Sequence, residues 1–316
     1  MAEPPYGIIW NHLKKSEVIP FLGAGASLSG RPPNADWDAK STTFLPTGAE
    51  LARRLAAEAE FPGDEAERDD LSRVASYYQE SIDRPGLVGR LREVFDKDYQ
   101  PGQIHEFLAD LASPVLIVTT NYDDLIEKAL TRKKKPYHLI VHPADRKDLA
   151  ASVLWWKPGE AEPTPHPPAK LPLSLTDTTI IYKMHGSVDR QQKTWDSFVI
   201  TEEDYVEFLA RMTGQSAIPA RFMALFRKCR FLFLGYGLRD WNLRVILKNL
   251  KTTLPRPEAE VVDAEPDAPL PQEGLRSWAI QRRPSELEQM LWQARKVSIY
   301  DMEIDAFVAK MRKQIN

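Results

Sequence analysis

Residues 18–27 read VIPFLGAGAS, an apolar run that ends in a glycine-rich turn. Such a run is typical of a buried strand that stops at a tight backbone turn. Comparable apolar runs recur along the chain, and stretches with helical spacing follow most of them. They lie at residues 115–119, 179–184, 230–234, 277–280 and 296–300. This alternation predicts an α/β fold with a Rossmann-like, mostly parallel sheet that is covered by helices on both faces.

Helical spacing is clearest after the first strand. Thr47 and Glu50 have the spacing of a capping box, so we expect a helix from Gly48 toward Glu60. Further helices are expected at residues 70–81, 87–95, 104–111, 123–130, 202–212, 241–250, 286–294 and 305–313. Residues of about 44–112 contain several helical patterns and no convincing strand. We interpret them as a helical insertion after the first strand, beside the carboxyl edge of the sheet.

The composition is that of a globular protein. The chain has 316 residues, of which 43% are hydrophobic and 28% charged, and we expect a single domain over residues 1–316. Six prolines fall at residues 158–172 and five at 255–271. Because proline removes a backbone donor and restricts its neighbour, surface loops are predicted at about 157–177 and 251–274.

Charge and cysteine content exclude several classes of function. A formal net charge of -3 gives no global basic field, so direct binding to nucleic acid is not expected. Cys229 is the single cysteine, which rules out an internal disulfide and a zinc site built from four cysteines. With no signal sequence and no membrane-spanning run of apolar residues, a cytoplasmic location is expected.

Polar or flexible residues follow four of the predicted strands. They read GAGAS at 23–27, TNYDD at 120–124, HGS at 185–187 and GYGLRDW at 235–241. The carboxyl ends of parallel strands are where open α/β sheets bind ligands, so we expect these groups to line one crevice. Taken singly, each has a structural explanation: a turn for the glycines, a helix cap for Asp123, Asp124 or Asp240, and a packing role for His185.

Together, the GAGAS, TNYD and HG motifs resemble the cofactor signature of sirtuins. The segment LGYGLRD at 234–240 resembles the sirtuin-like NADases of bacterial antiphage defence, although that branch often carries serine at the position of Gly237. The resemblance implies contacts with NAD+ at residues of three motifs and a catalytic role for three side chains. The contacts are Gly23, Ala24, Gly25 and Ser27 at the phosphates, Thr120 beside them, and Gly235, Gly237 and Asp240 toward the adenosine. The catalytic residues are Asn121 and Asp123 at the nicotinamide ribose and His185 as the base.

The resemblance implies hydrolysis of NAD+, as substrate, to nicotinamide and ADP-ribose. Protein deacylation is not expected, because the deacylating sirtuins carry a zinc ribbon of four cysteines; no zinc or other metal is predicted. A defence enzyme that depletes NAD+ in abortive infection must be controlled. We therefore expect homo-oligomerisation or a separate sensor subunit, such as an Argonaute-like protein or a translocase-type ATPase.

Two alternatives stay open at the level of sequence. The same pocket suits a non-catalytic module that senses NAD or ADP-ribose. The basic run RKKK at 132–135 suits an effector subunit of a nucleic-acid-targeting complex, although four cations just past a helix end also complement the helix dipole.

Overall fold

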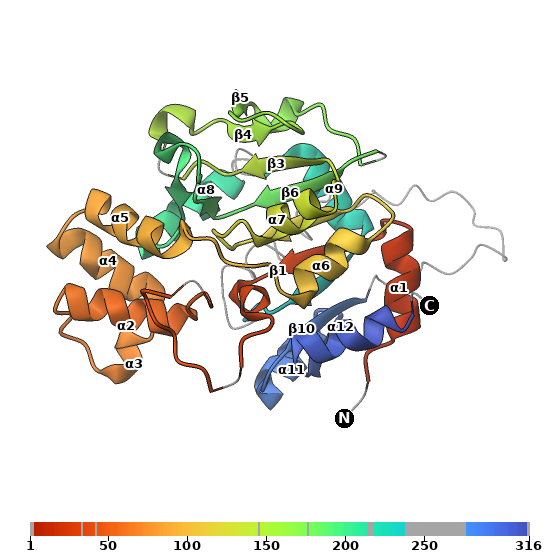
Figure 1. Cartoon of the computed structure of the whole chain (residues 1–316), viewed down its shortest axis with the longest axis horizontal. Coiled ribbons are helices and arrows are strands. Elements are labelled where there is room, and N and C mark those ends of the chain that lie inside the picture. The colour runs from red at the N-terminus through yellow and green to blue at the C-terminus, as the bar shows by residue number, and fades with distance from the viewer. Residues whose placement is uncertain are drawn as a thin grey trace, which may run out of the picture.

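The computed structural model describes residues 3–32, 34–41, 43–144, 146–175, 177–213, 218–237 and 276–314. Its main sheet has nine strands in the order β11-β10-β9-β1-β2-β6-β3-β4-β5 (Figure 1). The strands predicted from the sequence are all present and parallel to their neighbours in this order. They are β1 (Val18–Leu22), β2 (Leu116–Thr119), β6 (Thr179–Lys183), β9 (Arg230–Leu234), β10 (Ser277–Gln281) and β11 (Val297–Asp301). The predicted α/β fold is confirmed.

One edge of the sheet was missed by the sequence analysis. There, β3 (Tyr137–Val141) pairs parallel with β6, and β4 (Val153–Trp156) and β5 (Thr164–His166) continue antiparallel. β5 lies within the proline-rich stretch, and as the outermost strand it can hold Pro165. A separate two-stranded sheet joins β7 (Gly186–Ser187) to β8 (Ser197–Phe198).

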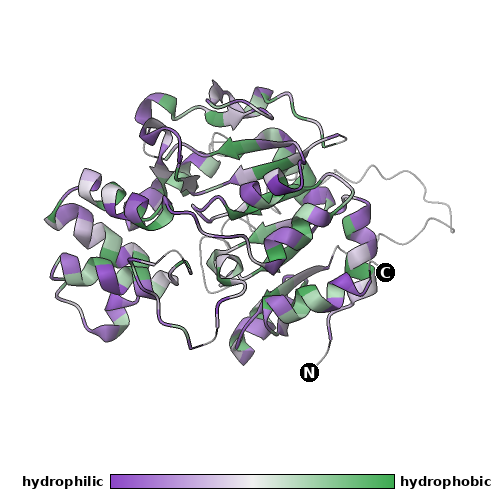
Figure 2. Ribbon diagram, in the orientation of Figure 1, coloured by the Kyte–Doolittle hydropathy of each residue, from purple (hydrophilic) through white to green (hydrophobic). Residues whose placement is uncertain are grey.

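Helices cover both faces of the sheet, as the uninterrupted apolar strands require. Along β1, Ile19 and Phe21 belong to one apolar cluster, and Val18 and Leu22 belong to the other. On the near side in Figure 1 lie α6 (Gln103–Asp110), α7 (Leu125–Arg132) and α12 (Ile304–Arg312), joined by α1 (Tyr6–Lys14). The opposite cluster draws on α8 (Glu202–Thr213), α9 (Ala220–Lys228) and α11 (Glu286–Gln293). In Figure 2 the apolar colour accordingly follows the strands and the inward helix faces.

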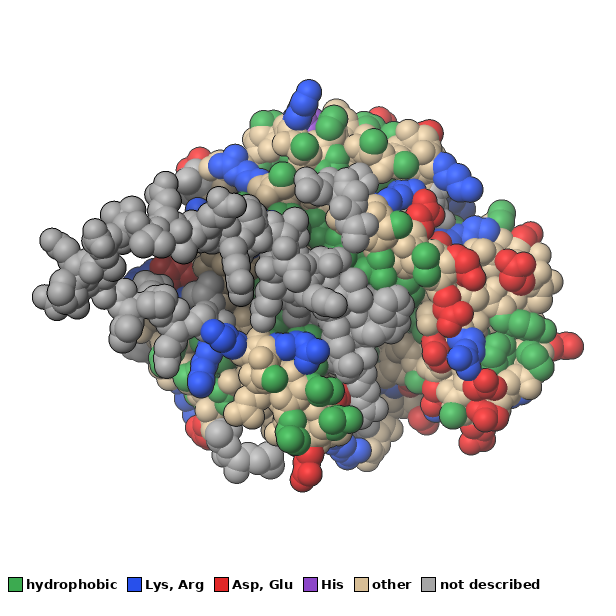
Figure 3. All heavy atoms as spheres, turned by 180° about the vertical axis from the view of Figure 1, so that it is seen from behind, with side chains coloured by type: hydrophobic (Ala, Val, Ile, Leu, Met, Phe, Trp, Pro, Cys, Tyr) green, Lys and Arg blue, Asp and Glu red, His purple; other side chains and the backbone are tan. Residues whose placement is uncertain are grey.

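Four helices between β1 and α6 form a lobe beyond the carboxyl ends of the strands (Figure 1). They are α2 (Gly48–Glu58), α3 (Glu65–Arg68), α4 (Leu71–Ser81) and α5 (Arg84–Phe95). The capping box predicted for α2 is present, with Thr47 and Glu50 each bonding the other's backbone N–H. The lobe has its own apolar cluster, which includes Tyr122 from the segment after β2. In Figure 3 acidic side chains gather over this lobe.

Some predicted elements fall outside the described residues. These are the helix at 241–250, the loop at about 251–274 and the site candidate Asp240. Among the helices that are described, none has the length and apolar character needed to cross a membrane.

Candidate active site

Two glycine turns pack directly against each other at the carboxyl ends of β1 and β9. Gly23 N–H donates to Leu234 O at 3.0 Å, and Gly25 N–H donates to Gly235 O at 2.8 Å. Gly235 has a φ of +64°, and a Cβ there would lie 2.3 Å from Ala26 N. Glycine at this position therefore serves both the backbone conformation and the close approach. The contact fixes the path of the following 3-10 turn η1 (Ala24–Leu28).

A cavity of about 780 Å³ opens beside this contact. Gly25, Gly235 and Gly237, three of the predicted binding residues, line it together with Arg31 and Asp305. Its size is within the range of small-molecule sites, which is roughly 300–1,000 Å³. Arg31 and Asp305, which the sequence analysis did not single out, are held in place, Arg31 by an ion pair with Glu50 at 2.5 Å and Asp305 by Ser29.

The predicted residues after β2 form a hydrogen-bonded chain with η1. Asn121 Nδ2 donates to Gly23 O at 2.9 Å and to Ser27 Oγ at 2.8 Å, and Ser27 Oγ donates to Asp123 Oδ2 at 2.6 Å. Asn121 is 8% exposed and Asp123 is 5% exposed. Thr120 N–H donates to Leu22 O at 3.3 Å, which ties the same segment to β1. The structure thus brings together residues that lie about a hundred positions apart in the chain.

Asp123 also accepts, through Oδ1, the N–H of Leu125, the first residue of α7, at 3.2 Å while it holds Ser27. The N-cap of α7 is Asp124, whose side chain makes no capping hydrogen bond. The contact of Asp123 with the start of α7 is therefore compatible with the site prediction for this residue. The next carboxylate, Asp124, points away from the chain of hydrogen bonds. It pairs with Lys128 at 3.1 Å and with Arg190 at 3.2 Å.

His185 lies at the end of the neighbouring strand. Thr119 of β2 is in register with Lys183 of β6, so Asn121 and His185 each stand two residues beyond that pair. The imidazole is 3% exposed and packs edge-on against Tyr205 and Phe208 of α8, with ring centroids 5.3 and 5.4 Å away. The Asn121 amide contacts η1 and the His185 ring contacts α8, so the two side chains are held by different elements.

Comparison with known proteins decides the family. The model of the SIR2-like domain matches residues 115–300, more than half of the chain. This chain belongs to the SIR2-like domain family. The matched range holds the Asn121 and His185 motifs, while the glycine turn after β1 precedes it.

The SIR2-like chain is also similar to curated bacterial proteins. It is 30% identical over 245 residues to "NAD(+) hydrolase ThsA" of Acinetobacter baumannii (strain 532279) and 28% identical over 250 residues to "NAD(+) hydrolase ThsA" of Enterococcus faecium. Each alignment covers 77% of this chain and 41% of the relative, so the chain spans about two-fifths of their length. "Defense-associated sirtuin 2" of Bacillus subtilis is 22% identical over 179 residues, 57% of this chain and 15% of the relative.

A buried ion pair stabilises the segments that follow β2 and β6. Lys183 is fully buried, with Nζ 2.7 Å from Glu127 Oε1, and it donates to Asp123 O at 2.5 Å and to Ser187 Oγ at 3.0 Å. Burial raises the pKa of the Glu127 carboxyl, and the Lys183 ammonium opposes that rise. The lysine therefore fixes the backbone beside the Asn121 segment. A lysine inside the apolar strand TIIYKM was the available sequence signal for this role.

A second histidine lies near the predicted site. His105 of α6 is 1% exposed, and its Nδ1 accepts the N–H of Gly102 at 3.1 Å. Burial lowers the pKa of this imidazole, and the nearby Asp123 carboxylate opposes the shift. The sequence analysis gave His105 no role, because its proximity to Asp123 depends on how α6 packs.

Two remaining features from the sequence analysis are the basic run at residues 132–135 and the question of a metal site. Lys133 pairs with Asp110, the last residue of α6, at 2.7 Å, and Lys135 Nζ donates to Leu111 O, directly after α6, at 2.5 Å. Two cations of the run therefore have partners within the protein, near the end of α6. Within the described part of the chain, no group of three or more His, Cys, Asp or Glu side chains is placed to hold a metal ion.

Proposed function

We propose that this protein hydrolyses NAD+ to nicotinamide and ADP-ribose in antiphage defence. The curated relatives named NAD(+) hydrolase and the relative named defense-associated sirtuin support the proposal. The observation that carries it in this chain is the set of hydrogen bonds that joins Gly23, Ser27, Asn121 and Asp123 beside the glycine-lined cavity.

The reaction needs little covalent help from the protein. The nicotinamide of NAD+ is already a cationic ring, so it leaves as a neutral molecule when the bond from its nitrogen to ribose C1′ breaks. A water oxygen then bonds to C1′ and releases one proton. The site has to position the water and stabilise the developing positive charge on the ribose. We assign Asn121 and Asp123 to the ribose and the water, and His185 to the proton.

The remaining assignments follow the motifs. The phosphates lie against Gly23, Ala24, Gly25 and Ser27, with Thr120 beside them, and the adenosine lies toward Gly235 and Gly237. Asp240 is also assigned to the adenosine in this proposal. A zinc ribbon of four cysteines has no counterpart in a sequence whose single cysteine is Cys229, so water is the proposed acceptor and protein deacylation is not.

Asn121→Ala tests the assignment. Loss of one positioned hydrogen-bonding group in such a site lowers the rate on the order of 10²-fold, so nicotinamide release, followed by chromatography after incubation with NAD+, should fall by that factor. Asn11→Ala, at an exposed asparagine of α1, is the matched control and should retain the wild-type rate. Wild-type turnover by Asn121→Ala, with its melting temperature unchanged, would refute the catalytic role.

A non-catalytic sensing module is the second candidate, because the His185 imidazole is closely packed between Tyr205 and Phe208. The same incubation separates the two functions. Saturable binding of NAD+ or ADP-ribose without release of nicotinamide, under conditions that activate the protein, favours the sensor.

Control of the activity belongs to the proposal as well. An NADase that acts in abortive infection has to be inactive before infection. We assign the control to self-assembly or to a separate sensor subunit, such as an Argonaute-like protein or a translocase-type ATPase. Nicotinamide release measured across protein concentrations, with the mass of the species measured by light scattering, tests self-assembly: a rate per molecule that is constant in a monomer contradicts it.

A further inference from the structure

The backbone of His185, the proposed base, is fixed by the hairpin of β7 and β8. His185 O accepts the N–H of Val199 at 2.9 Å, and Gly186 pairs with Phe198 across the hairpin. Gly186 has a φ of +87°, and a Cβ there would lie 1.9 Å from Ser197 O, so the two strands approach closely at this point. The ring of His185 is held separately, by α8. The position of this side chain therefore depends on where β8 and α8 lie.

Arg84, the first residue of α5 in the helical lobe, contacts both of these elements. Its Nη2 donates to Phe198 O of β8 at 2.8 Å, and its Nη1 pairs with Asp204 of α8 at 2.8 Å. Asp204 Oδ2 also accepts the N–H groups of Ile200 and Thr201, each at 3.0 Å, so the carboxylate fixes the short connection from β8 to α8 as well. A planar guanidinium suits two acceptors in a fixed geometry. One side chain of the lobe thus joins the two elements that hold His185.

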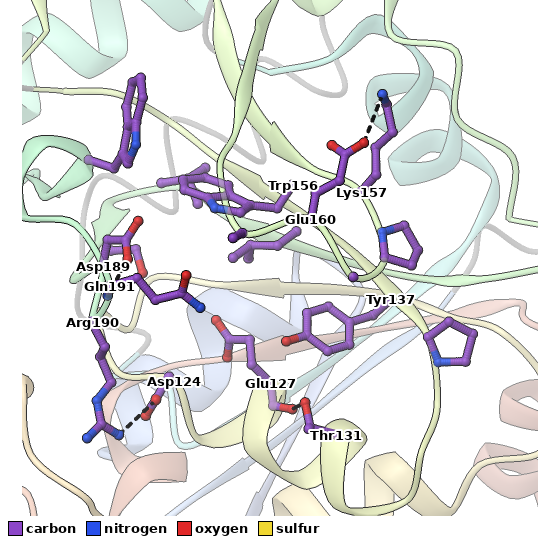
Figure 4. Close-up of a pocket in the computed structure, with 18 of the residues that line it drawn as sticks. Asp124, Glu127, Thr131, Tyr137, Trp156, Lys157, Glu160, Asp189, Arg190 and Gln191 are labelled. Atoms are coloured by element: carbon purple, nitrogen blue, oxygen red, sulfur yellow. Dashed lines mark hydrogen bonds and ion pairs between the residues drawn. The ribbon is translucent and has the colours of Figure 1, made fainter.

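Helix α5 also holds the loop of the β7–β8 hairpin. Arg92 donates to Asp189 O at 2.8 Å and pairs with Asp196 at 2.7 Å, across the loop. From the same loop, Arg190 pairs with Asp124, at the start of α7, at 3.2 Å (Figure 4). The hairpin that follows β6 is therefore fixed to the lobe by α5 and to the sheet side by α7.

We propose that Arg84 is a positioning residue for His185: it holds β8 and α8 in one arrangement, and these elements set the backbone and the ring of the proposed base. The consequence for the reaction rests on the proposed hydrolysis of NAD+. A reacting group that is misplaced by about 1 Å can lose about 10²-fold in rate. Arg84 is not among the described residues that line the cavity beside the glycine turns, so binding of NAD+ there should not depend on it.

Arg84→Met removes both hydrogen bonds and keeps much of the volume of the side chain. We expect kcat for nicotinamide release to fall about tenfold or more, with KM for NAD+ nearly unchanged, because the base is displaced and the binding cavity is not. Arg54→Met is the matched control: the Arg54 side chain is likewise 23% exposed, and it pairs with Glu58 and Glu93 within the lobe. It should keep the wild-type kcat. Equal values of kcat in the two folded variants, or a rise in KM alone, overturn the proposal.

Chemical labelling tests the contact without the reaction. Diethyl pyrocarbonate modifies accessible imidazoles, and mass spectrometry of peptides reads each histidine separately. His185 and His105 are 3% and 1% exposed. Loss of a charge-assisted hydrogen bond shifts a local opening equilibrium about tenfold, so His185 should react about tenfold faster in Arg84→Met, while His105 on α6 keeps its rate. A rate at His185 equal to that in Arg54→Met overturns the proposal.

Asp204→Asn is the second variant, for the case that Arg84→Met exposes His105 as well and so loosens the whole fold. The asparagine keeps an oxygen for the N–H groups of Ile200 and Thr201 but loses the charge that pairs with Arg84. Labelling of His185 should again rise while that of His105 does not. Unchanged labelling of His185 in Asp204→Asn overturns the inference.

The two readouts separate this inference from the proposed function. If the wild-type protein releases no nicotinamide, the proposed function fails, and labelling alone decides whether Arg84 holds His185. If labelling of His185 rises in Arg84→Met but kcat stays at the wild-type value, Arg84 does not position a base for this reaction and the inference is overturned.

Discussion

Lys183 holds the candidate site together at the scale of a single residue. Its ammonium pairs with Glu127 and bonds the backbone beside Asn121, all within the interior. Removing one partner of a buried ion pair leaves the other charge uncompensated, which costs about 3–5 kcal/mol of unfolding free energy. We predict this loss for Lys183→Met, measured by urea denaturation.

Two further variants make that prediction specific. The double variant Lys183→Met/Glu127→Leu removes both charges and should recover most of the loss, since apolar replacements of buried pairs are often neutral. Lys170→Met, at an exposed lysine, should change stability little. A single variant as stable as Lys170→Met, or a double variant no more stable than the single one, contradicts the account.

His142 makes stability depend on pH. It is 1% exposed, packs against Phe208 at 5.1 Å between ring centroids, and burial, together with the charges of Arg211 and His185, lowers its pKa to about 3. Because the unfolded chain takes up this proton near pH 6.5 and the folded chain does not, stability is full above that pH and falls as the pH drops toward 3.

The measurable consequence of this buried imidazole lies between pH 7.5 and 5. His142 should account for about 2 kcal/mol of lost unfolding free energy over that range. The unfolding free energy of His142→Phe should therefore fall by about 2 kcal/mol less than that of the wild type. His105, whose pKa burial also lowers, stays in both proteins and contributes the same slope to each. Identical pH slopes for His142→Phe and the wild type would count against the buried neutral imidazole.

At the scale of elements, the contact between the two glycine turns leaves no room for an added side chain. Gly235→Ala puts a Cβ at a positive φ and 2.3 Å from Ala26 N, so the turns after β1 and β9 must separate. We predict a loss of about 2 kcal/mol or more in unfolding free energy. Gly237→Ala provides the matched comparison, because a Cβ there meets no atom of the described residues within 4 Å. Equal midpoints in thermal unfolding for the two variants would show that a Cβ at position 235 does not disturb the contact between the turns.

Elements with uninterrupted apolar runs could be predicted from sequence, and those at the sheet edge could not. β1 and β9 are buried on both faces, so their composition alone marks them as strands. β3 begins with the half-buried Tyr137, His138 and Leu139, and β5 is only three residues long and contains a proline. Their strand identity comes from pairing with neighbours, which local sequence does not record.

Some residues of the candidate site could likewise be predicted from the sequence, and others could not. Ser27, Asn121 and Asp123 could be selected because each follows an apolar run that ends at the same sheet edge. The partnership of Lys183 with Glu127 and the place of His105 beside Asp123 depend on how α6 and α7 pack on the sheet. No periodicity in the sequence encodes those contacts, because the partners lie on separate elements.

At the scale of the whole molecule, the helical lobe is joined to the strand ends through Tyr122. This side chain stands between Asn121 and Asp123, packs edge-on against Phe95 at 5.3 Å and Phe198 at 5.1 Å, and donates its hydroxyl to Val199 O at 2.6 Å. The lobe therefore contacts the residue that lies between the two residues proposed to act on the ribose. A change in the lobe's packing should reach the site by this route.

Tyr122→Ala tests that coupling, given the proposed activity. Truncation of a buried aromatic costs about 3–5 kcal/mol of stability, and below the melting temperature we predict a fall in nicotinamide release as well, because Asn121 and Asp123 lose their common anchor. Tyr77→Ala is the control: Tyr77 packs in the same lobe, 5.2 Å from Phe61, but does not adjoin the site. A wild-type rate in folded Tyr122→Ala, or an equal fall in both variants, would mean that the lobe does not act on the site through this side chain.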